Sequence, residues 1–328
     1  MTTKRKLIAS LLIIVFTVVL AACGGNSDNE SAANNSDSDN VIRVGYQKGN
    51  TLHILKESGF LDEAAAEEGY SIKWEMFTHG GTLMEGIYAG VIDFGHAADG
   101  PGIFAQASDK PFVYVGADAP NPEGVGLMVR TDSGITSIEE LKGKKIGALE
   151  GGNHHYSAIL AIESAGLTVD DVEWVYPEDA AQGRALFETG EIDALSSYDP
   201  FFASAEVEMD VITLADGQID DYPNRTFYFA SEQFAEEHPE LIDFILEAID
   251  KSDQWANENK EEVVEIMSEA LGISEEVISH QLNRRTFGAT KITEEIIEAQ
   301  QKQADKYYEI GLIPKEIDVR EKVFEIDE

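Results

Sequence analysis

The sequence predicts an α/β protein built from two similar lobes with a cleft between them. Three observations indicate this fold class. Strand-like and helix-like segments alternate from residue 41, and a second alternating block follows from about residue 125. The roughly 290 residues from position 41 onward exceed what one hydrophobic core usually supports. Such a pair of lobes commonly closes on a small ligand by hinge motion.

The first 22 residues predict a secretory signal. Lys4, Arg5 and Lys6 precede an apolar run that ends in small residues at Ala22. The run is shorter than the roughly 20 residues of a membrane span, which disfavours a permanent transmembrane helix. Residues 20–23 resemble a bacterial lipoprotein signal, in which the cysteine is acylated and becomes the mature N-terminus. We therefore expect a lipid on Cys23.

The segment after Cys23 predicts a flexible tether, because residues 24–40 carry no side chain able to seed a core. The folded part would then stay at the outer face of the bacterial cytoplasmic membrane. The expected divisions are a signal peptide (1–22), a lipid-anchored tether (23–40), a first lobe (41–128 with 228–328) and a second lobe (129–227).

The charge balance excludes several partners. The chain has 24 Lys and Arg against 62 Asp and Glu, a formal net charge of −38. Nucleic acid and anionic lipid headgroups are therefore poor partners. Acidic pairs such as Glu261 with Glu262 and Glu275 with Glu276 are expected on exposed helix faces. The protein is expected to be a monomer. No disulfide is expected in the mature domain, since Cys23 is the single cysteine.

The first block predicts strands separated by helices. A strand over 41–46 leads into a helix that starts near Thr51, and a period of two over 71–77 marks a half-buried strand. Leu83, Met84 and Ile87 have helical spacing. The next strand is expected at 91–95.

The second block repeats this order and ends in helices. Ser137 and Glu140 form a capping box on a short helix. The expected strands are 145–149, 172–176 and 192–195, and the expected helices are 153–164 and 180–189. After a strand at 226–230, amphipathic helices are expected near 240–258, 261–270, 275–284 and 293–310, wrapping the first lobe.

Four loops follow predicted strands, and ligands of parallel sheets bind at such carboxyl ends, where helix N-termini favour anions. The loops are 47–51, 96–100, 150–155 and 196–200. Glycine and asparagine in each loop are also ordinary turn residues. Their placement at successive strand ends predicts a shared anion site.

Arg225 is the cation expected to face this site, from a segment that re-enters the first lobe. A guanidinium could donate a fork of hydrogen bonds to an oxyanion. The alternative is a surface arginine paired with Asp220 or Asp221.

Histidines near the loops raise the question of a metal, but the sequence favours none. His79, His96, His154 and His155 lack the one-turn spacing of a helical zinc site. We expect no metal and no cofactor. The sequence also has no nucleophile elbow, phosphate-binding loop or dinucleotide fingerprint, so it predicts no enzyme.

With these loops the chain resembles the solute-binding proteins of ABC importers that serve nitrate, sulfonates, taurine and thiamine-precursor pyrimidines, and within them the aliphatic-sulfonate-binding members. The resemblance implies a periplasmic-binding-protein-like type II clamp. The residues that carry it are 43–51, 90–94 with Asp99, 104–107, 113–116, 141–145, 198–201 and 313–320.

The resemblance also implies a set of ligand-binding residues. Matched by position they are Gln47, Thr51, Asp99, Gly152, Asn153, Tyr198 and Asp199, and the loops add Ala98, His154 and Arg225. Residues 77–81 and Ala98 depart from the family pattern. The headgroup site is thus expected to be kept, and the tail pocket to have a different shape.

The implied function is a lipoprotein that captures an aliphatic sulfonate and delivers it to a membrane permease energised by a separate ATPase. Taurine, nitrate or a thiamine-precursor pyrimidine is the alternative ligand. The fold also resembles enzymes of thiamine-pyrimidine synthesis, which use a histidine and a cysteine cluster. The chain has no cysteine beyond Cys23, which disfavours this alternative.

Overall fold

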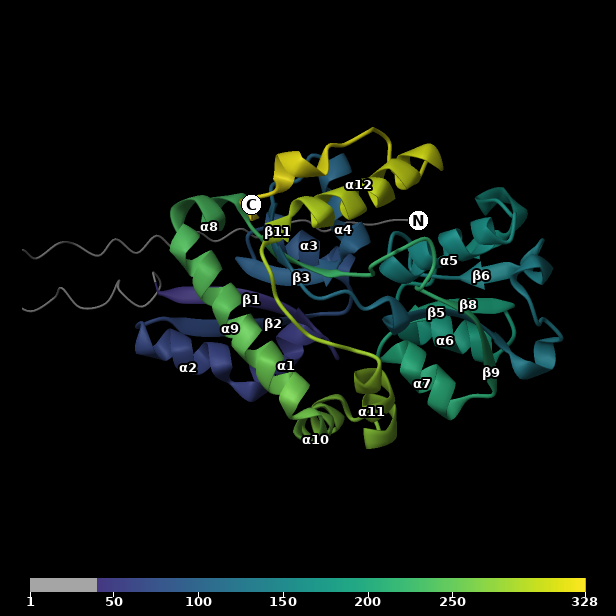
Figure 1. Cartoon of the computed structure of the whole chain (residues 1–328), viewed down its shortest axis with the longest axis horizontal. Helices are drawn as coiled ribbons and strands as arrows, with labels where there is room; N and C mark the ends of the chain where they lie inside the picture. The colour runs from purple at the N-terminus through teal and green to yellow at the C-terminus, as the bar shows by residue number, and fades with distance from the viewer. Residues whose placement is uncertain (1–39, 328) are drawn as a thin grey trace, which may run out of the picture. The chain divides into compact units, whose positions relative to one another are not determined.

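A computed structural model of the protein describes residues 40–327 (Figure 1). The expected signal peptide, the tether up to residue 39 and the lipid site Cys23 lie outside the described residues. The described part forms one compact unit that contains two five-stranded sheets, which confirms the α/β fold class. Within it, no helix has both the length and the apolar character needed to cross a membrane.

The first sheet is parallel except for one strand. The strand order is β2 (Ser71–Phe77), β1 (Val41–Gln47), β3 (Phe94–Ala98), β10 (Thr226–Ala230) and β4 (Val113–Ala117). The pairs β1·β2 and β1·β3 are parallel, whereas β10 runs antiparallel to both of its neighbours. Strand β10 is therefore where the chain returns to this sheet from the second one.

The second sheet repeats the pattern. Its order is β7 (Glu173–Val175), β6 (Lys145–Gly147), β8 (Ala194–Tyr198), β5 (Val125–Arg130) and β9 (Val211–Asp216). Strand β6 is parallel to β7 and β8, and β5 is antiparallel to β8 and β9. A separate pair, β11 (Ile292–Thr293) and β12 (Ile326–Asp327), completes the strands of the described residues.

The change from one sheet to the other comes earlier than expected. Strand β5 pairs from Val125 to Arg130 entirely within the second sheet. The expected division between residues 128 and 129 thus falls inside a strand. Its hydrogen-bonded neighbours β8 and β9 both belong to the second sheet, so the first crossing between the sheets is the segment 118–124.

Two strands begin later than their apolar residues suggested. The expected strands 91–95 and 192–195 are β3 from Phe94 and β8 from Ala194. In each case the third and fourth residues after the helix still bond backward into it, as Val91 N–H does to the carbonyl of Gly86 and Glu191 N–H to that of Leu186. These residues close a turn, and the strand starts only after it.

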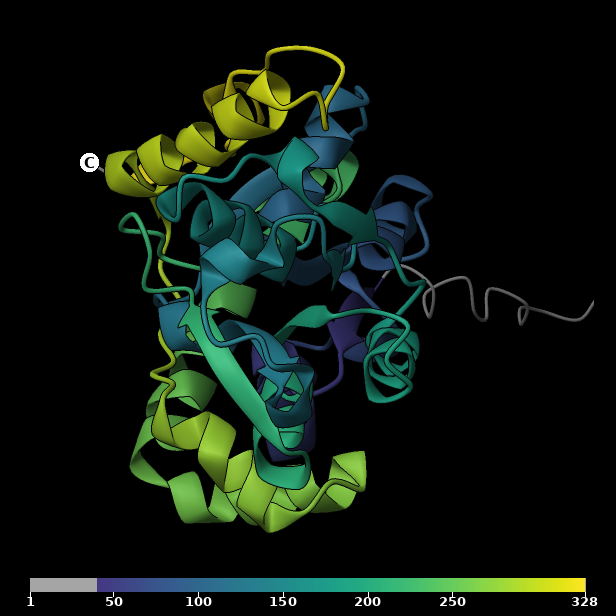
Figure 2. The ribbon, with the colours of Figure 1, turned by 90° about the vertical axis from the view of Figure 1, so that its right-hand side faces the viewer.

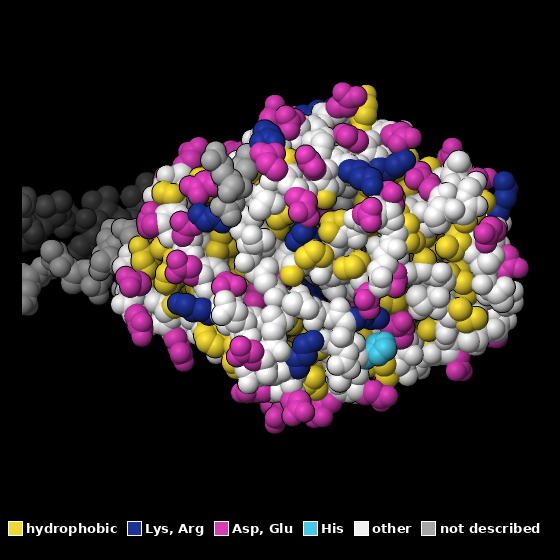
Figure 3. All heavy atoms as spheres, in the orientation of Figure 1, with side chains coloured by type: hydrophobic (Ala, Val, Ile, Leu, Met, Phe, Trp, Pro, Cys, Tyr) yellow, Lys and Arg dark blue, Asp and Glu magenta, His cyan; other side chains and the backbone are white. Residues whose placement is uncertain are grey.

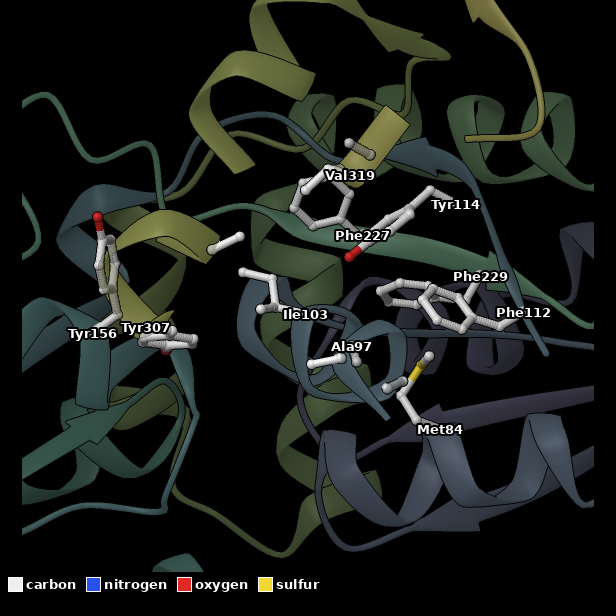
Figure 4. Packing of buried hydrophobic residues seen from close by; sticks show 14 of the residues in the cluster. Met84, Ala97, Ile103, Phe112, Tyr114, Tyr156, Phe227, Phe229, Tyr307 and Val319 are labelled. Carbon is white, nitrogen blue, oxygen red and sulfur yellow. The ribbon is translucent and has the colours of Figure 1, made fainter. Parts of the chain in front are cut away.

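Helices cover both faces of the first sheet (Figures 1 and 2). On one face lie α1 (Thr51–Ser58), α2 (Phe60–Glu67) and α9 (Pro239–Glu258), packed on buried residues such as Ile42 and Tyr228. On the other lie α3 (Gly80–Tyr88), α4 (Asp99–Ala107) and α12 (Glu294–Glu309). Figure 4 shows the aromatic part of this second layer, where Phe112, Tyr114 and Phe229 meet edge to face or tilted.

The second sheet is covered in the same way. Helix α5 (Asn153–Ser164) packs on one face, against residues that include Leu127 and Ile146. Helices α6 (Ala180–Glu188) and α7 (Phe201–Glu208) cover the other face, where Phe187 and Phe202 are buried. Each lobe is thus a three-layer α/β sandwich.

The C-terminal third is helical, as expected. Besides α9 and α12 it contains α8 (Glu232–Glu237), α10 (Lys260–Leu271) and α11 (Glu275–Asn283). Helices α9 and α12 cover the first sheet, and α10 and α11 pack beside α1. The acidic pairs on α10 and α11 are exposed, as predicted, and acidic side chains are spread widely over the face in Figure 3.

One buried side chain makes folding sensitive to acid. His96 on β3 is fully buried, and neither ring nitrogen has a hydrogen-bond partner among the described residues. Burial lowers the pKa of His96 to about 3. The pKa of this ring in the unfolded chain is 6.5. The folded protein, which holds the ring neutral, therefore has its full free energy of unfolding with respect to His96 above pH 6.5 and loses part of it as the pH falls toward 3.

We expect His96→Leu to weaken the dependence of the free energy of unfolding on pH in the acid range. Unfolding free energies from urea titrations between pH 7.5 and 5 should fall less steeply than in the wild type, by at most about 1.4 kcal/mol per pH unit. Asp99, whose pKa burial raises to about 6, acts in the opposite direction but is present in both proteins. His238→Leu, whose side chain is 43% exposed in the wild type, is the matched control. Equal slopes for His96→Leu and the wild type would contradict this prediction.

Candidate functional site

A cavity of about 300 Å³ lies between the two lobes, at the carboxyl ends of the sheet strands. All four loops expected at strand ends contribute to its wall. The first lobe supplies Gln47, Asn50, His79, Gly80, Gly81, Met84, Glu85, Tyr88, Ala98, Pro101, Phe104, Ala105, Ser108, Lys110, Ala119, Thr226 and Arg285. The second lobe and the crossings supply Asn121, Gly124, Leu149, Glu150, Gly151, Gly152, Asn153, His154, Tyr198, Asp199 and Asn224.

Four helices reach this wall with their N-termini. Asn50 caps α1 and its side chain accepts the N–H of Thr51, Ala98 caps α4, and Gly152 caps α5. Helix α3 contributes its first residue, Gly80. The first N–H groups of a helix have no partner inside it, and the aligned peptide dipoles add partial positive charge there. The cavity is therefore suited to an anion.

A buried arginine adds a full positive charge. Arg285 is 6% exposed and donates from Nη2 to Asp118 Oδ2 at 2.8 Å and to Asn50 Oδ1 at 3.1 Å. Its guanidinium lies 4.5 Å from the centre of the Phe287 ring. Its Nε has no hydrogen-bond partner among the described residues. The contacts hold the guanidinium in place and leave it donor capacity.

His154 contributes a neutral ring on the second-lobe side. Its Nε2 accepts the backbone N–H of Leu149 at 2.9 Å, and the ring lies 4.9 Å from that of Tyr198. Burial lowers the pKa of His154 to about 3. At neutral pH the ring thus carries its proton on Nδ1, which faces the side-chain oxygen of Asn153 at 3.2 Å.

At one edge of the cavity the backbones of the two lobes come into direct contact. A Cβ on Gly100 would come within 1.8 Å of the carbonyl oxygen of Gly151. On the same side, the Tyr156 ring of α5 meets the Tyr307 ring of α12 edge to face at 5.6 Å (Figure 4). Only glycine at position 100 permits this approach.

Seven of the ten expected ligand residues line the cavity. They are Gln47, Ala98, Gly152, Asn153, His154, Tyr198 and Asp199. Gln47 donates to the carbonyl of His96 at 2.8 Å, and Asn153 Nδ2 donates to Asn224 Oδ1 at 2.8 Å. These two side chains at strand ends thus donate to groups of the protein itself, one to a backbone carbonyl and the other to a side chain on the segment that returns to the first lobe.

Two expected residues lie behind the wall. The Thr51 hydroxyl is buried and donates to Asp253 Oδ1 at 3.0 Å. Asp99 accepts from the Tyr222 hydroxyl at 2.5 Å and from Gln303 at 3.1 Å. Both side chains support the loops behind the wall, and neither residue lines the cavity.

Arg225 does not line the cavity either. Asn224, whose φ of 46° turns the chain at this point, and Thr226 do. Arg225 points away from the cavity, where Nη1 donates to the carbonyl of Asp118 at 3.0 Å and Nη2 lies 4.0 Å from Glu295. The carboxylate partner is Glu295 rather than the expected Asp220 or Asp221.

Sequence reasoning missed Arg285 and Asn224. Arg285 follows α11 in the helical C-terminal third, far along the chain from every strand-end loop. Its one local signal is the pair Arg284-Arg285 at the end of an otherwise acidic helix. No group of three or more His, Cys, Asp or Glu side chains within residues 40–327 could hold a metal ion.

The two sheets, their antiparallel crossing strands and the enclosed cavity define a periplasmic-binding-protein-like fold. The family model described as NMT1/THI5 like matches residues 66–263. The chain belongs to this NMT1/THI5-like family.

Similar proteins agree with this assignment. A relative from Escherichia coli (strain K12), named as an aliphatic sulfonates-binding protein, is 32% identical over 291 residues, covering 88% of this chain and 90% of that protein. The crystal structure of the periplasmic aliphatic sulphonate binding protein SsuA from Escherichia coli matches with a TM-score of 0.80 at 31% identity, over 88% of this chain and 93% of that chain. The alkanesulfonate-binding protein SsuA from Xanthomonas axonopodis pv. citri bound to MOPS matches with a TM-score of 0.83 at 26% identity, over 88% and 99%.

Proposed function

We propose that the protein is the solute-binding component of an ABC importer and captures an aliphatic sulfonate. The observation that carries the proposal is the convergence of four helix N-termini and buried Arg285 on one cavity. A sulfonate keeps its charge at every biological pH and offers three acceptor oxygens. Fixed N–H donors and an arginine suit it without any proton transfer. The names of the relatives from Escherichia coli support the same ligand class.

The difference in exposure among the lining residues indicates how the proposed ligand would lie in the cavity. Among the lining residues Arg285 and Asn224 are buried, whereas Glu85 of α3 and Ser108 after α4 are exposed, so we place the opening of the cavity along α3 and α4. Between these ends the wall is largely apolar. The apolar side chains there belong to Met84, Tyr88, Pro101, Phe104 and Ala105. We place the sulfonate group at the buried end and its carbon tail toward the opening.

The remaining parts of the function follow from this role. The captured sulfonate would be passed to a membrane permease driven by a separate ATPase, and the protein would itself catalyse nothing. A lipid on Cys23 would hold it at the outer face of the cytoplasmic membrane. The absence of cysteine after Cys23 supports a binding protein over a thiamine-pyrimidine synthase, which uses a cysteine cluster.

A ligand series tests the function. In calorimetry and thermal-shift assays we expect affinity to rise from methanesulfonate to hexanesulfonate by about fourfold for each methylene, because each buried methylene contributes about 0.8 kcal/mol. A cavity of about 300 Å³ has roughly ten times the liquid volume of one water molecule, enough for such a tail. Met84→Trp should abolish the chain-length dependence, and the half-exposed Met76→Trp should not. Preferential binding of taurine, nitrate or the pyrimidine, or no binding of any sulfonate, would overturn the assignment.

A comparison of two arginine variants tests which residue binds the sulfonate group. Arg285→Gln should weaken hexanesulfonate binding by about 1.5–3 kcal/mol, the range for a hydrogen bond to a charged group, and Arg225→Gln should leave it unchanged. Because Arg285→Gln also leaves Asp118 buried without its cation, the double variant Arg285→Gln/Asp118→Asn serves as the folding control. It should regain thermal stability but not affinity. Wild-type affinity in the double variant would remove Arg285 from the site.

The anchor has its own test. When the full chain is expressed in a bacterial host, it should sediment with membranes and its N-terminal peptide should carry the mass of acyl chains. Cys23→Ser should release the protein or block its processing. A full chain that is processed but not acylated, or a Cys23→Ser chain that is processed and distributed as in the wild type, would contradict the lipid.

A further inference from the structure

Asp199 is an unexpected group in an anion site. Three carboxylates line the cavity, and two of them, Glu85 and Glu150, are exposed. The Asp199 side chain is only 2% exposed. A buried carboxylate that faced a sulfonate alone would repel it strongly, because solvent screens the charge little at such a site.

Arg284 holds this carboxylate on both oxygens. Its Nε donates to Asp199 Oδ2 at 2.9 Å and its Nη2 to Oδ1 at 2.5 Å, a bidentate pair. The guanidinium lies 4.4 Å from the centre of the Phe202 ring, and Nη1 donates to Glu206 Oε2 at 2.6 Å. Arg284 itself does not line the cavity, and its side chain is 12% exposed.

The pair joins the two lobes. Asp199, Phe202 and Glu206 belong to the end of β8 and to α7 in the second lobe. Arg284 follows α11, whose Ile278 belongs to the same buried cluster as Ile54 of α1.

A further contact fixes α11 to the first lobe. Gln281 of α11 donates to the carbonyl of Gly49 at 3.1 Å. Arg284 is therefore held by the first lobe and binds the second.

A histidine joins the same contact. Nε2 of His280, one turn before Arg284 on α11, lies 3.0 Å from Glu206 Oε2. Helix α11 thus presents two basic side chains to the acidic face of α7, on the side of the cavity away from Gly100 and Gly151. At the other edge the lobes meet through the Gly100–Gly151 backbone approach, the Tyr156–Tyr307 ring contact and an ion pair of Lys306 with Glu163 at 3.3 Å.

We propose that Arg284 is a positioning residue that locks the lobes together and masks the Asp199 carboxylate, so that no bare buried carboxylate faces the anion. Asp199 is then part of the lock and does not bind the ligand. The lock stands on geometry alone, while its effect on affinity rests on the proposed sulfonate function.

The lock is tested first without ligand. Distances between spin labels at Met76→Cys in the first lobe and Tyr176→Cys in the second, both exposed sites, are measured in the full chain with Cys23→Ser. Arg284→Gln should lengthen and broaden the distance distribution. Arg184→Gln is the matched control, because Arg184 pairs at 2.7 Å with Glu188 and Glu208 within the second lobe alone. An unchanged distribution for Arg284→Gln would overturn the lock.

The masking is tested with hexanesulfonate by stopped-flow kinetics and calorimetry. Arg284→Gln should weaken binding by at least about tenfold, chiefly through faster dissociation. The double variant Arg284→Gln/Asp199→Asn should bind at least about threefold more tightly than Arg284→Gln, because it has no bare carboxylate. Equal affinities of these two variants would overturn the masking. If the wild type bound no sulfonate, the proposed function would fail, and the distance measurement would still decide the lock.

Discussion

The buried carboxylate of Asp118 joins the three chain segments that meet between the lobes. It follows β4 at the start of the first crossing, and its N–H donates to the carbonyl of Thr226 on the returning segment at 2.8 Å. Its side chain accepts from Arg285 at 2.8 Å and from the N–H of Gly288 at 2.9 Å, both on the segment after α11. A charge buried this deeply is stable only when several donors surround it. The geometry of the cavity therefore depends on these donors remaining together.

The central place of Asp118 explains why two arginines that are distant in sequence lie differently relative to the cavity. Arg225 and Arg285 both contact Asp118, one at its backbone carbonyl and the other at its carboxylate. Only the arginine on the carboxylate side is directed into the cavity. The other closes the crossing from behind and lies near Glu295. A cation in the correct segment is thus insufficient, because the backbone direction at that residue decides whether its side chain faces the cavity.

Much of the fold could be predicted from the sequence because its periodicity is local. Helix α5 lies at the expected residues 153–164, and the helices after residue 238 agree to within one residue of most expected ends. The starts of β3 and β8 could not be predicted, because the apolar residues Ile92 and Ile192 are buried in turns as readily as in strands. Loop positions at strand ends identified the cavity wall. The roles of Asp199 and Arg285 depend on a helix that approaches from a distant part of the chain, and no spacing rule contains that information.

The approach of Gly100 to Gly151 has a consequence for how such a clamp can change over evolution. Where two lobes meet through side chains, their separation can be adjusted by one methylene at a time. Here a carbonyl oxygen lies where a Cβ would be, so the separation at this edge is fixed by the radii of backbone atoms. The edge acts as a mechanical stop. Adaptation to a larger or smaller ligand must therefore come from the walls along α3 and α4, while the distance between the lobes at the stop remains a constant of the fold.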